Sequence, residues 1–329
     1  MLAKFTFLLL LSAVTLPTWA QGGHRHSPGI THRAAPRPDS VGQPQGAHAT
    51  LAHRAKLSDE VAESSGLAYV AGGLWTCNDG GNPPVLFRLD TASGRVVQRV
   101  RITNFTNVDW EDLTADTYYL YVGDFGNNNG DRRNLRVLRV AQASLGPADT
   151  TATAEAIEFS YPDQEDFTRH TNQHNFDCEA FFYANDSLHL FTKNWGDLQT
   201  RYYTLPAVPG AYIARLRGQF NTDGLVTAAA LNAAGSVAGL LGYNAHNGNT
   251  FLWLLSDFSH YGFLQGNKRR LDLPNALITG QAEGLCFTDR YRVFVSSERF
   301  TPFFTIPQKL YTLNVKRWLQ PKQSTTPRR

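Results

Sequence analysis

The chain has 329 residues, 42% of them hydrophobic and 18% charged, which excludes global disorder and allows one large domain or two of average size. Its formal net charge of +3 is too small to indicate nucleic acid as the main partner. Aromatic residues make up 12% of the chain and 27 residues are glycine, a balance that favours an all-β protein over a helical one.

The first 20 residues are typical of a secretory signal peptide. Lys4 supplies the positive start, and the apolar run from Phe5 to Leu16 is too short to span a membrane. Thr18 and Ala20 place small residues at positions −3 and −1 of a cleavage site, and no lipobox cysteine follows it. We therefore expect a secreted or periplasmic protein without a transmembrane segment.

Composition divides the remaining chain into three parts. Residues 21–48 are rich in His, Pro and Gly and are predicted to form a disordered leader. Residues 49–316 are predicted to fold, and residues 317–329 form a basic tail. Acidic residues outnumber basic ones between the two basic termini, which is compatible with cation binding.

A short motif recurs along the predicted domain. Residues 107–113 and 175–181 both read N-x-D-x-E-x-φ, residues 281–285 and 63–67 are shorter versions, and residues 225–229 are a degraded fifth copy. The mean spacing of about 54 residues fits one four-stranded blade of a β-propeller. The sequence therefore predicts a propeller with five four-stranded blades. Six blades are the alternative, because the 68 residues between the second and third copies could hold extra strands.

Short apolar segments after each copy predict the other strands of each blade. In chain order these segments are 74–77, 85–89, 96–102, 118–122, 134–140, 156–161, 188–192, 201–205, 237–241 or 251–255, 293–295 and 309–315. The last blade lacks one strand, and the alternating segment 50–57 is expected to complete it and close the ring. Closure would remove exposed sheet edges. The three cysteines fit no metal-binding spacing and are expected to be buried strand residues, with no disulfide pair indicated.

The repeat also predicts a metal site. The innermost strand of a propeller blade lines the central channel, and a period of two puts Asp109 and Glu111 on one side, as it does Asp177 and Glu179. One residue per blade would then form a ring around the axis, namely Ser65, Glu111, Glu179, Thr227 and Glu283. Oxygen ligands of this kind suit Ca²⁺. The alternative is that these carboxylates tie the blades together by accepting hydrogen bonds from backbone N–H groups.

The loops on the same face offer further polar groups. Three carboxylates are candidates for activating water, namely Asp79, Asp124 and Asp177. Five side chains are candidates for binding a small anionic or sugar-like ligand, or a protein partner, namely Arg132, Arg133, Lys193, Trp195 and Arg299. Residues 163–177 are expected to lie over this face as a flap, where His170 and His174 could bind a metal if helical. The chain contains no standard catalytic motif, and we expect a monomer.

The first two blades resemble the calcium-dependent soluble apyrases. The resemblance is carried by four segments, namely Glu63-x-Ser65-x-Leu67, Trp75-Thr-x-Asn78-Asp79, Trp110-Glu111 and Leu120-Tyr-Val-Gly123. Apyrases of this kind are secreted five-bladed propeller nucleotidases with one Ca²⁺ in the channel. The resemblance implies the same metal ligands at the five ring positions, with Thr227 in place of the family's Ser.

Two loops depart from the apyrase pattern. Residues 78–82 lack the family's Arg, and residues 124–127 replace its Gly-Lys-Glu-Trp, so the resemblance extends further for the scaffold and metal site than for the nucleotide site. The chain also looks like exported bacterial propellers of unassigned function. It is loosely similar to gluconolactonase-type propellers, whose metal is bound by a Glu in a turn such as Glu283-Gly284-Leu285.

Two functional hypotheses follow from these patterns. The first is a binding propeller whose loop face captures a ligand while Ca²⁺ rigidifies the ring. The second is a Ca²⁺-dependent hydrolase of a phosphoanhydride, phosphoester or lactone, in which the metal polarises the P–O or C=O bond.

Overall fold

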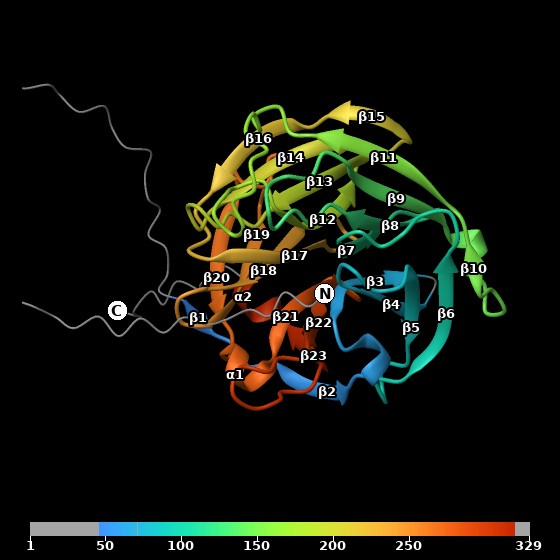
Figure 1. Cartoon of the computed structure of the whole chain (residues 1–329). Coiled ribbons are helices and arrows are strands. Elements are labelled where there is room, and N and C mark those ends of the chain that lie inside the picture. Colours follow the sequence, from blue (N-terminus) through green and yellow to red (C-terminus); the bar gives the residue numbers. More distant parts are fainter. Residues whose placement is uncertain (1–45, 71, 320–329) are drawn as a thin grey trace, which may run out of the picture. The chain divides into compact units, whose positions relative to one another are not determined.

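The computed structural model describes residues 46–70 and 72–319. Their strands form five separate sheets, each antiparallel among its four principal strands, and the sheets follow one another around a central axis (Figure 1). The innermost strand of each sheet lies beside the innermost strand of the next, and the last lies beside the first. The predicted five-bladed propeller is therefore confirmed.

The blades follow the chain, with the innermost strand first. Blade one contains β3 (Ser64–Val70), β4 (Gly73–Asn78), β5 (Val85–Leu89) and β6 (Val96–Ile102). Blade two contains β7 (Trp110–Ala115), β8 (Tyr119–Asp124), β9 (Leu135–Ala141) and β11 (Ala154–Ser160). Blade three contains β12 (Cys178–Ala184), β13 (Ser187–Thr192), β14 (Thr200–Pro206) and β16 (Arg215–Phe220). Blade four contains β17 (Leu225–Leu231), β18 (Val237–Tyr243), β19 (Thr250–Ser256) and β20 (Asn267–Asp272).

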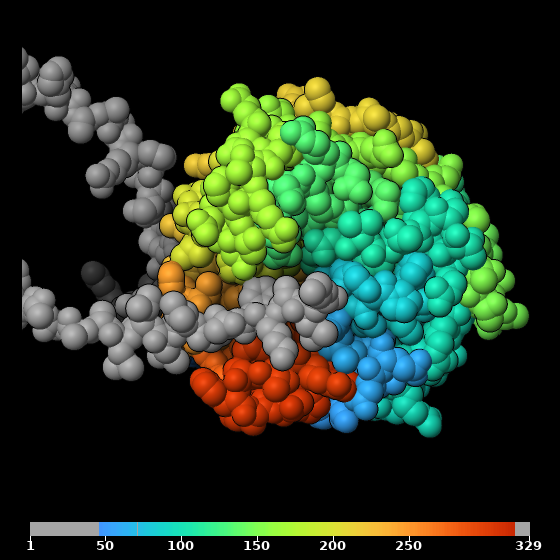
Figure 2. Space-filling model, viewed as in Figure 1, coloured from blue at the N-terminus to red at the C-terminus, as the bar shows by residue number. Residues whose placement is uncertain are grey.

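Blade five joins the two ends of the described chain. It contains β21 (Gln281–Phe287), β22 (Arg292–Glu298) and β23 (Lys309–Asn314), and β2 (Ala52–Lys56) pairs antiparallel with β23 as the fourth strand. Figure 2 shows the resulting contact between the blue N-terminal and the red C-terminal parts of the ring. The prediction that segment 50–57 completes the last blade is confirmed, and Leu51, Ala55 and Leu57 are its buried side chains.

Three short parallel strands cover outer edges of blades. β1 (Ala47–His48) pairs with β20, β10 (Thr151–Ala152) with β6, and β15 (Gly210–Ile213) with β11. Each of these strands immediately precedes the outermost strand of the following blade, so neighbouring blades are linked at their rims as well as at the axis. Covering an edge strand satisfies backbone groups that would otherwise pair with another chain.

The six-bladed alternative is wrong for the part of the chain that the structure describes. The long interval between the second and third motif copies holds η2 (Gln142–Ser144), β10 and an irregular connection at 161–177 instead of another blade. For the second strand of the fourth blade, the sequence left a choice between segments 237–241 and 251–255. Both segments form strands, namely β18 and β19.

Apolar side chains fill the space between neighbouring blades, including the fully buried Trp110 and Trp253. All three cysteines are buried strand residues as predicted, and each is a free thiol. Within residues 46–70 and 72–319, no helix has the length and apolar character needed to cross a membrane. The signal peptide, residues 21–45 of the leader and residues 320–329 of the tail lie outside the described residues, and the first described strand begins at Ala47.

A candidate metal centre at the channel mouth

Every inner strand contains a β-bulge at the same place. In blade two, Trp110 pairs with Asp124 and Asp112 pairs with Gly123, which leaves Glu111 as the extra residue. The same register shift occurs at the predicted ring position of each of the other four blades. In blade one the bulge contains Gly66 as well as Ser65. We call these residues the bulge ring: Ser65, Glu111, Glu179, Thr227 and Glu283. Each is between 1% and 4% exposed, and bulges are a common means of re-aiming a side chain beside a functional site.

The same registers align a second set of residues at the end of each second strand. In blade one, for example, Ser64 just before the bulge pairs with Asn78, and Asp79 is the next residue after Asn78. The other four members follow the corresponding residue of their own blade. We call this set the strand-end ring: Asp79, Phe125, Lys193, Tyr243 and Glu298. Phe125 lies in an apolar cluster between blades, whereas the other four positions carry polar or charged groups.

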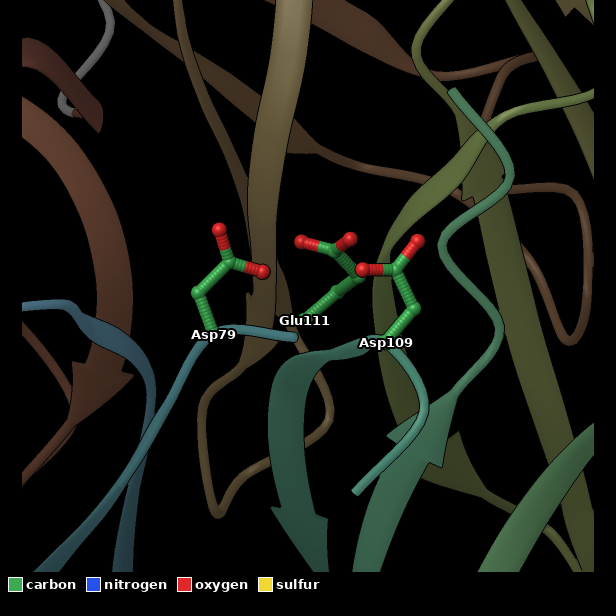
Figure 3. Close-up of side chains that lie close together, drawn as sticks. All are labelled: Asp79, Asp109 and Glu111. Atoms are coloured by element: carbon green, nitrogen blue, oxygen red, sulfur yellow. The ribbon is translucent and has the colours of Figure 1, made fainter. Parts of the chain in front are cut away.

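Three carboxylates from blades one and two converge at this mouth. Asp79 follows β4, Asp109 precedes β7, and Glu111 is the bulge residue of β7. One oxygen of each lies within 4.8 Å of the others, and Figure 3 shows the three groups pointing toward one another. Glu111 Oε1 is buried and has no hydrogen-bond partner. The described part of the chain brings together one such group of three or more His, Cys, Asp or Glu ligands.

Burial and mutual repulsion act on all three carboxyls. Burial and the neighbouring Asp109 raise the pKa of Asp79 to about 7. Burial and Asp177 raise the pKa of Asp109 to about 7. Burial, followed by Glu179, raises the pKa of Glu111 well above its usual range. Both effects disfavour the charged forms of the three carboxyls, and a bound cation would stabilise those charged forms.

The loop after β8 holds this cluster in place. Asp124 is fully buried, forms ion pairs of 3.1 Å with Arg132 and 2.7 Å with Arg136, and accepts the backbone N–H of Asp109 at 3.1 Å. Arg132 also donates to the carbonyl oxygen of Gly126 at 2.6 Å. A Cβ at Gly126 would overlap Glu111 Oε1 and lie 2.6 Å from Asp109 Oδ2. Glycine is therefore the residue that lets the loop pass this close to the carboxylates.

Blade three contributes a buried ion pair instead of an unpaired acid. Lys193 Nζ lies 2.9 Å from Glu179 Oε2, and the two side chains are 3% and 4% exposed. Burial lowers the pKa of Lys193, but Glu179 and neighbouring acidic groups outweigh it, so the net pKa is well above the ordinary value. The ammonium also lies over the rings of Trp195 and Tyr243, at 5.2 and 5.7 Å from their centroids.

The remaining bulge-ring residues have local contacts. Thr227 Oγ1 donates to the carbonyl oxygen of Ala282 at 2.8 Å, which links blades four and five. Gln281 donates to Glu283 Oε1. Ser65 lies at the bulge of β3, 3% exposed. The prediction that all five bulge-ring residues ligate one cation stays a prediction.

The other predicted site residues have structural partners. Asp177 accepts the backbone N–H of Asn127 at 2.6 Å and the indole N–H of Trp195 at 2.9 Å. Arg299 pairs with Asp59 and donates to Gln308. Arg133 stacks on Phe167 at 3.6 Å from the ring centroid.

The predicted flap lies against the loop that follows β8. His170 N and Asn172 N donate to the carbonyl oxygens of Asn129 and Asn128, both at 2.9 Å. The segment is not helical. His170 Nε2 lies 3.6 Å from Asp166 Oδ2, whereas His174 Nδ1 accepts the backbone N–H of Phe176. The two histidines are therefore not arranged as the i, i+4 pair that a metal would need.

Asp112 is a functional candidate that the sequence reasoning missed. This fully buried carboxylate accepts the backbone N–H groups of Phe181 at 3.1 Å and Ala229 at 3.2 Å, from the inner strands of blades three and four. It also accepts the N–H of Leu113 at 2.8 Å. The alternative hypothesis gave the tying of blades to the ring carboxylates, whereas in the structure Asp112, next to the ring residue Glu111, makes these bonds. Its signal was the acidic pair Glu111-Asp112, which is absent from the other motif copies.

Comparisons with known proteins identify no family for this chain. No protein-family description matches the chain, and no curated protein matches it significantly. A PQQ-bound aldose sugar dehydrogenase from Streptomyces coelicolor aligns over 80% of this chain and 96% of its own, at 9% identity and a TM-score of 0.43. A 6-phosphogluconolactonase, so assigned provisionally, from Bacteroides fragilis aligns over 74% and 67%, at 16% identity and a TM-score of 0.37. U3-55K aligns over 80% and 96%, at 9% identity and a TM-score of 0.36. These similarities specify no activity, and the resemblance to apyrases stays a prediction.

Proposed function

We propose that this propeller binds one Ca²⁺ ion through Asp79, Asp109 and Glu111, and that the ion anchors a small oxyanionic ligand on the loop face. The observation that carries the proposal is Glu111 Oε1, a buried oxygen without a hydrogen-bond partner beside two further carboxylates. An unpaired buried carboxylate is costly, and a cation removes that cost. A cluster that only tied blades together would have its oxygens bonded to N–H groups, as Asp112 does.

The donor set favours Ca²⁺ among the common metal ions. All three ligands are carboxylates, and hard cations bind oxygen ligands. Ca²⁺–O distances are about 2.3–2.6 Å, so ligands on opposite sides of the ion lie about 4.6–5.2 Å apart. Oxygens within 4.8 Å of one another can therefore share one such ion. The ion would need further oxygens, from water or from a ligand, because Ca²⁺ takes six to eight.

The ligand class follows from the charges around the site. Burial, followed by the negative charges of Glu283 and Asp79, raises the pKa of Glu298 above its usual range. Arg132 and Arg299 are paired with acids. An anion would therefore be recruited by the bound Ca²⁺ and not by these guanidinium groups. A phosphate or carboxylate group would supply the missing oxygens.

We also propose that the protein acts outside the cytoplasm, on the basis of its N-terminal sequence. Expression of the full chain in a secreting host should give an exported product that begins at Gln21, as read by N-terminal sequencing. Retention of residues 1–20 on the exported protein would contradict this proposal.

The test is Ca²⁺ binding by the folded chain. Calorimetry should give one site, and the melting temperature should rise by roughly 5–10 °C between EDTA and Ca²⁺ at 100 times its dissociation constant. Asp79→Asn and Glu111→Gln should each weaken binding at least tenfold. Glu155→Gln is the matched control, since Glu155 is a half-exposed partner of Arg139 on β11 of the same blade. Absence of binding in the parent protein, or equal affinity in Glu111→Gln, would refute the proposal.

The ligand is then tested on the Ca²⁺-loaded protein. Phosphate, simple phosphoesters, sugar acids and lactones form the panel, with turnover measured alongside binding. We expect binding of an oxyanion that disappears in EDTA. Binding that persists in EDTA would show that the metal does not anchor the ligand.

A further inference from the structure

Lys193 is the one basic residue among the ten positions of the bulge ring and the strand-end ring. It stands in blade three at the position that blade one fills with Asp79 and blade five with Glu298. The fold therefore places a cationic side chain where two other blades place carboxylates.

The ammonium group of Lys193 is enclosed. The side chain is 3% exposed, and its Nζ lies 2.9 Å from Glu179 Oε2. The rings of Trp195 and Tyr243 lie beside it, at 5.2 and 5.7 Å. Such packing fixes a buried cation in one place.

The acids of the mouth thus fall into two groups. Glu179 is paired with Lys193, and Glu283 accepts a hydrogen bond from Gln281 and also feels the charge of Lys193. Glu111, on the side of blades one and two, keeps an unpaired oxygen. A divalent cation beside the ammonium would be repelled by it. Among the described residues, the direct ion pair of Lys193 is with Glu179, and its charge reaches Asp79 and Asp109 only without such contact.

We propose that Lys193 acts as a built-in cation for Glu179 and Glu283, and so limits the mouth to a single metal ion on the side of Asp79, Asp109 and Glu111. The proposal rests on the proposed function for that metal ion. Removal of the lysine charge should turn Glu179 and Glu283 into a second Ca²⁺ site.

The experiment compares the parent chain with Lys193→Met and with the double variant Lys193→Met/Glu179→Gln. In EDTA, Lys193→Met should melt about 10 °C below the parent, because it leaves Glu179 as a buried charge without a partner. Ca²⁺ should restore most of that loss, and calorimetry should rise from one bound Ca²⁺ per chain to two. The double variant removes both charges together and should again bind one Ca²⁺, within about threefold of the parent affinity.

Each outcome has a distinct meaning. A stoichiometry of one in a folded Lys193→Met would overturn the inference, as would a melting temperature that Ca²⁺ raises no further than in the parent. If Lys193→Met does not fold, the double variant decides. Its binding at the parent affinity supports separate sites, and a loss of a hundredfold would show that Glu179 ligates the first ion. Failure of the parent chain to bind Ca²⁺ would refute the proposed function and, with it, the limit to a single ion. A gain of one site in Lys193→Met would then still show that the lysine charge keeps Ca²⁺ away from Glu179 and Glu283.

Discussion

The carboxylate of Asp112 should be one of the main links between blades. It is fully buried, and its Oδ2 accepts the N–H groups of Phe181 in β12 and Ala229 in β17. Asp112→Ala removes the acceptor of both N–H groups and of a third, that of Leu113. Each orphaned group costs about 1–3 kcal/mol, so the direct loss is about 3–9 kcal/mol.

Two effects reduce that loss. Burial raises the pKa of Asp112 well above its usual range, so removal of the group also removes a desolvation cost. Water could enter the space left by the carboxylate and pair with one N–H. We therefore expect a net loss of about 2–4 kcal/mol, a large share of the 5–15 kcal/mol typical of a folded domain.

Urea denaturation in EDTA measures this loss, and native-state amide hydrogen exchange locates it. Protection should fall at Phe181 and Ala229 before it falls elsewhere in blades three and four. Asp289→Ala is the matched control, because Asp289 also accepts two backbone N–H groups, at 2.8 and 2.7 Å, but in an exposed turn. Water replaces it there, so the control should lose less than about 1 kcal/mol. Equal losses in the two variants, with unchanged exchange at Phe181 and Ala229, would refute the reasoning.

Three further predictions test the remaining buried groups. Burial lowers the pKa of His189 to about 4, below its ordinary 6.5. The unfolded chain therefore takes up the proton first as pH falls, and between pH 6.5 and 4.5 the parent should lose about 2–3 kcal/mol of stability relative to His189→Gln, as urea titrations of both proteins at both pH values would reveal. Asp124→Asn should cost about 2–4 kcal/mol in the same assay, since it leaves Arg132 and Arg136 partly buried without a counter-charge. Gly126→Ala should lower Ca²⁺ affinity at least tenfold in calorimetry while stability in EDTA changes by less than about 1 kcal/mol, because the added Cβ displaces only the ends of two carboxylate side chains.

The fold could be predicted because a propeller repeats one supersecondary unit. Each blade has a polar residue at the same position near the start of its inner strand, so the spacing of the motif counts the blades. The closing strand was visible for a similar reason, since segment 50–57 alternates but has no partner nearby in the sequence. The blade count and the closing strand could both be inferred because each depends on a pattern within single strands and not on how strands pair.

The bulges could not be predicted, because a bulge is a property of two paired strands. The consecutive acids Glu111 and Asp112 interrupt the alternation of β7, but only its pairing with β8 shows that Glu111 is the extra residue. The motif copies at residues 107–113 and 175–181 also place their first aspartate differently, which their similar sequences do not show. Asp109 turns toward Glu111, whereas Asp177 in the equivalent position accepts hydrogen bonds from Asn127 and Trp195.

The acidic partners of the basic site residues could not be predicted from the sequence either. The sequence shows that Arg132, Lys193 and Arg299 are basic, but not that each has an acid within about 3 Å. Those acids come from different places: Asp124 lies eight residues away, whereas Asp59 lies 240 residues from Arg299. A basic side chain on a loop face is therefore evidence for anion binding only once its own counter-ion is known.

The repeat explains where a site can form, and the departures from the repeat decide what it binds. All five blades bring a bulge and a strand end to the channel mouth, so the backbone offers five equivalent positions. Blades one and two fill theirs with Asp79 and Glu111, whereas blade three adds Lys193 beside Glu179. A fivefold frame thus carries an uneven charge, and under the proposed function the cation binds on the side where a carboxylate oxygen has no partner. On this argument, a substitution that makes the blades more alike, such as Lys193→Met, should change the number of ions bound more than it changes the fold.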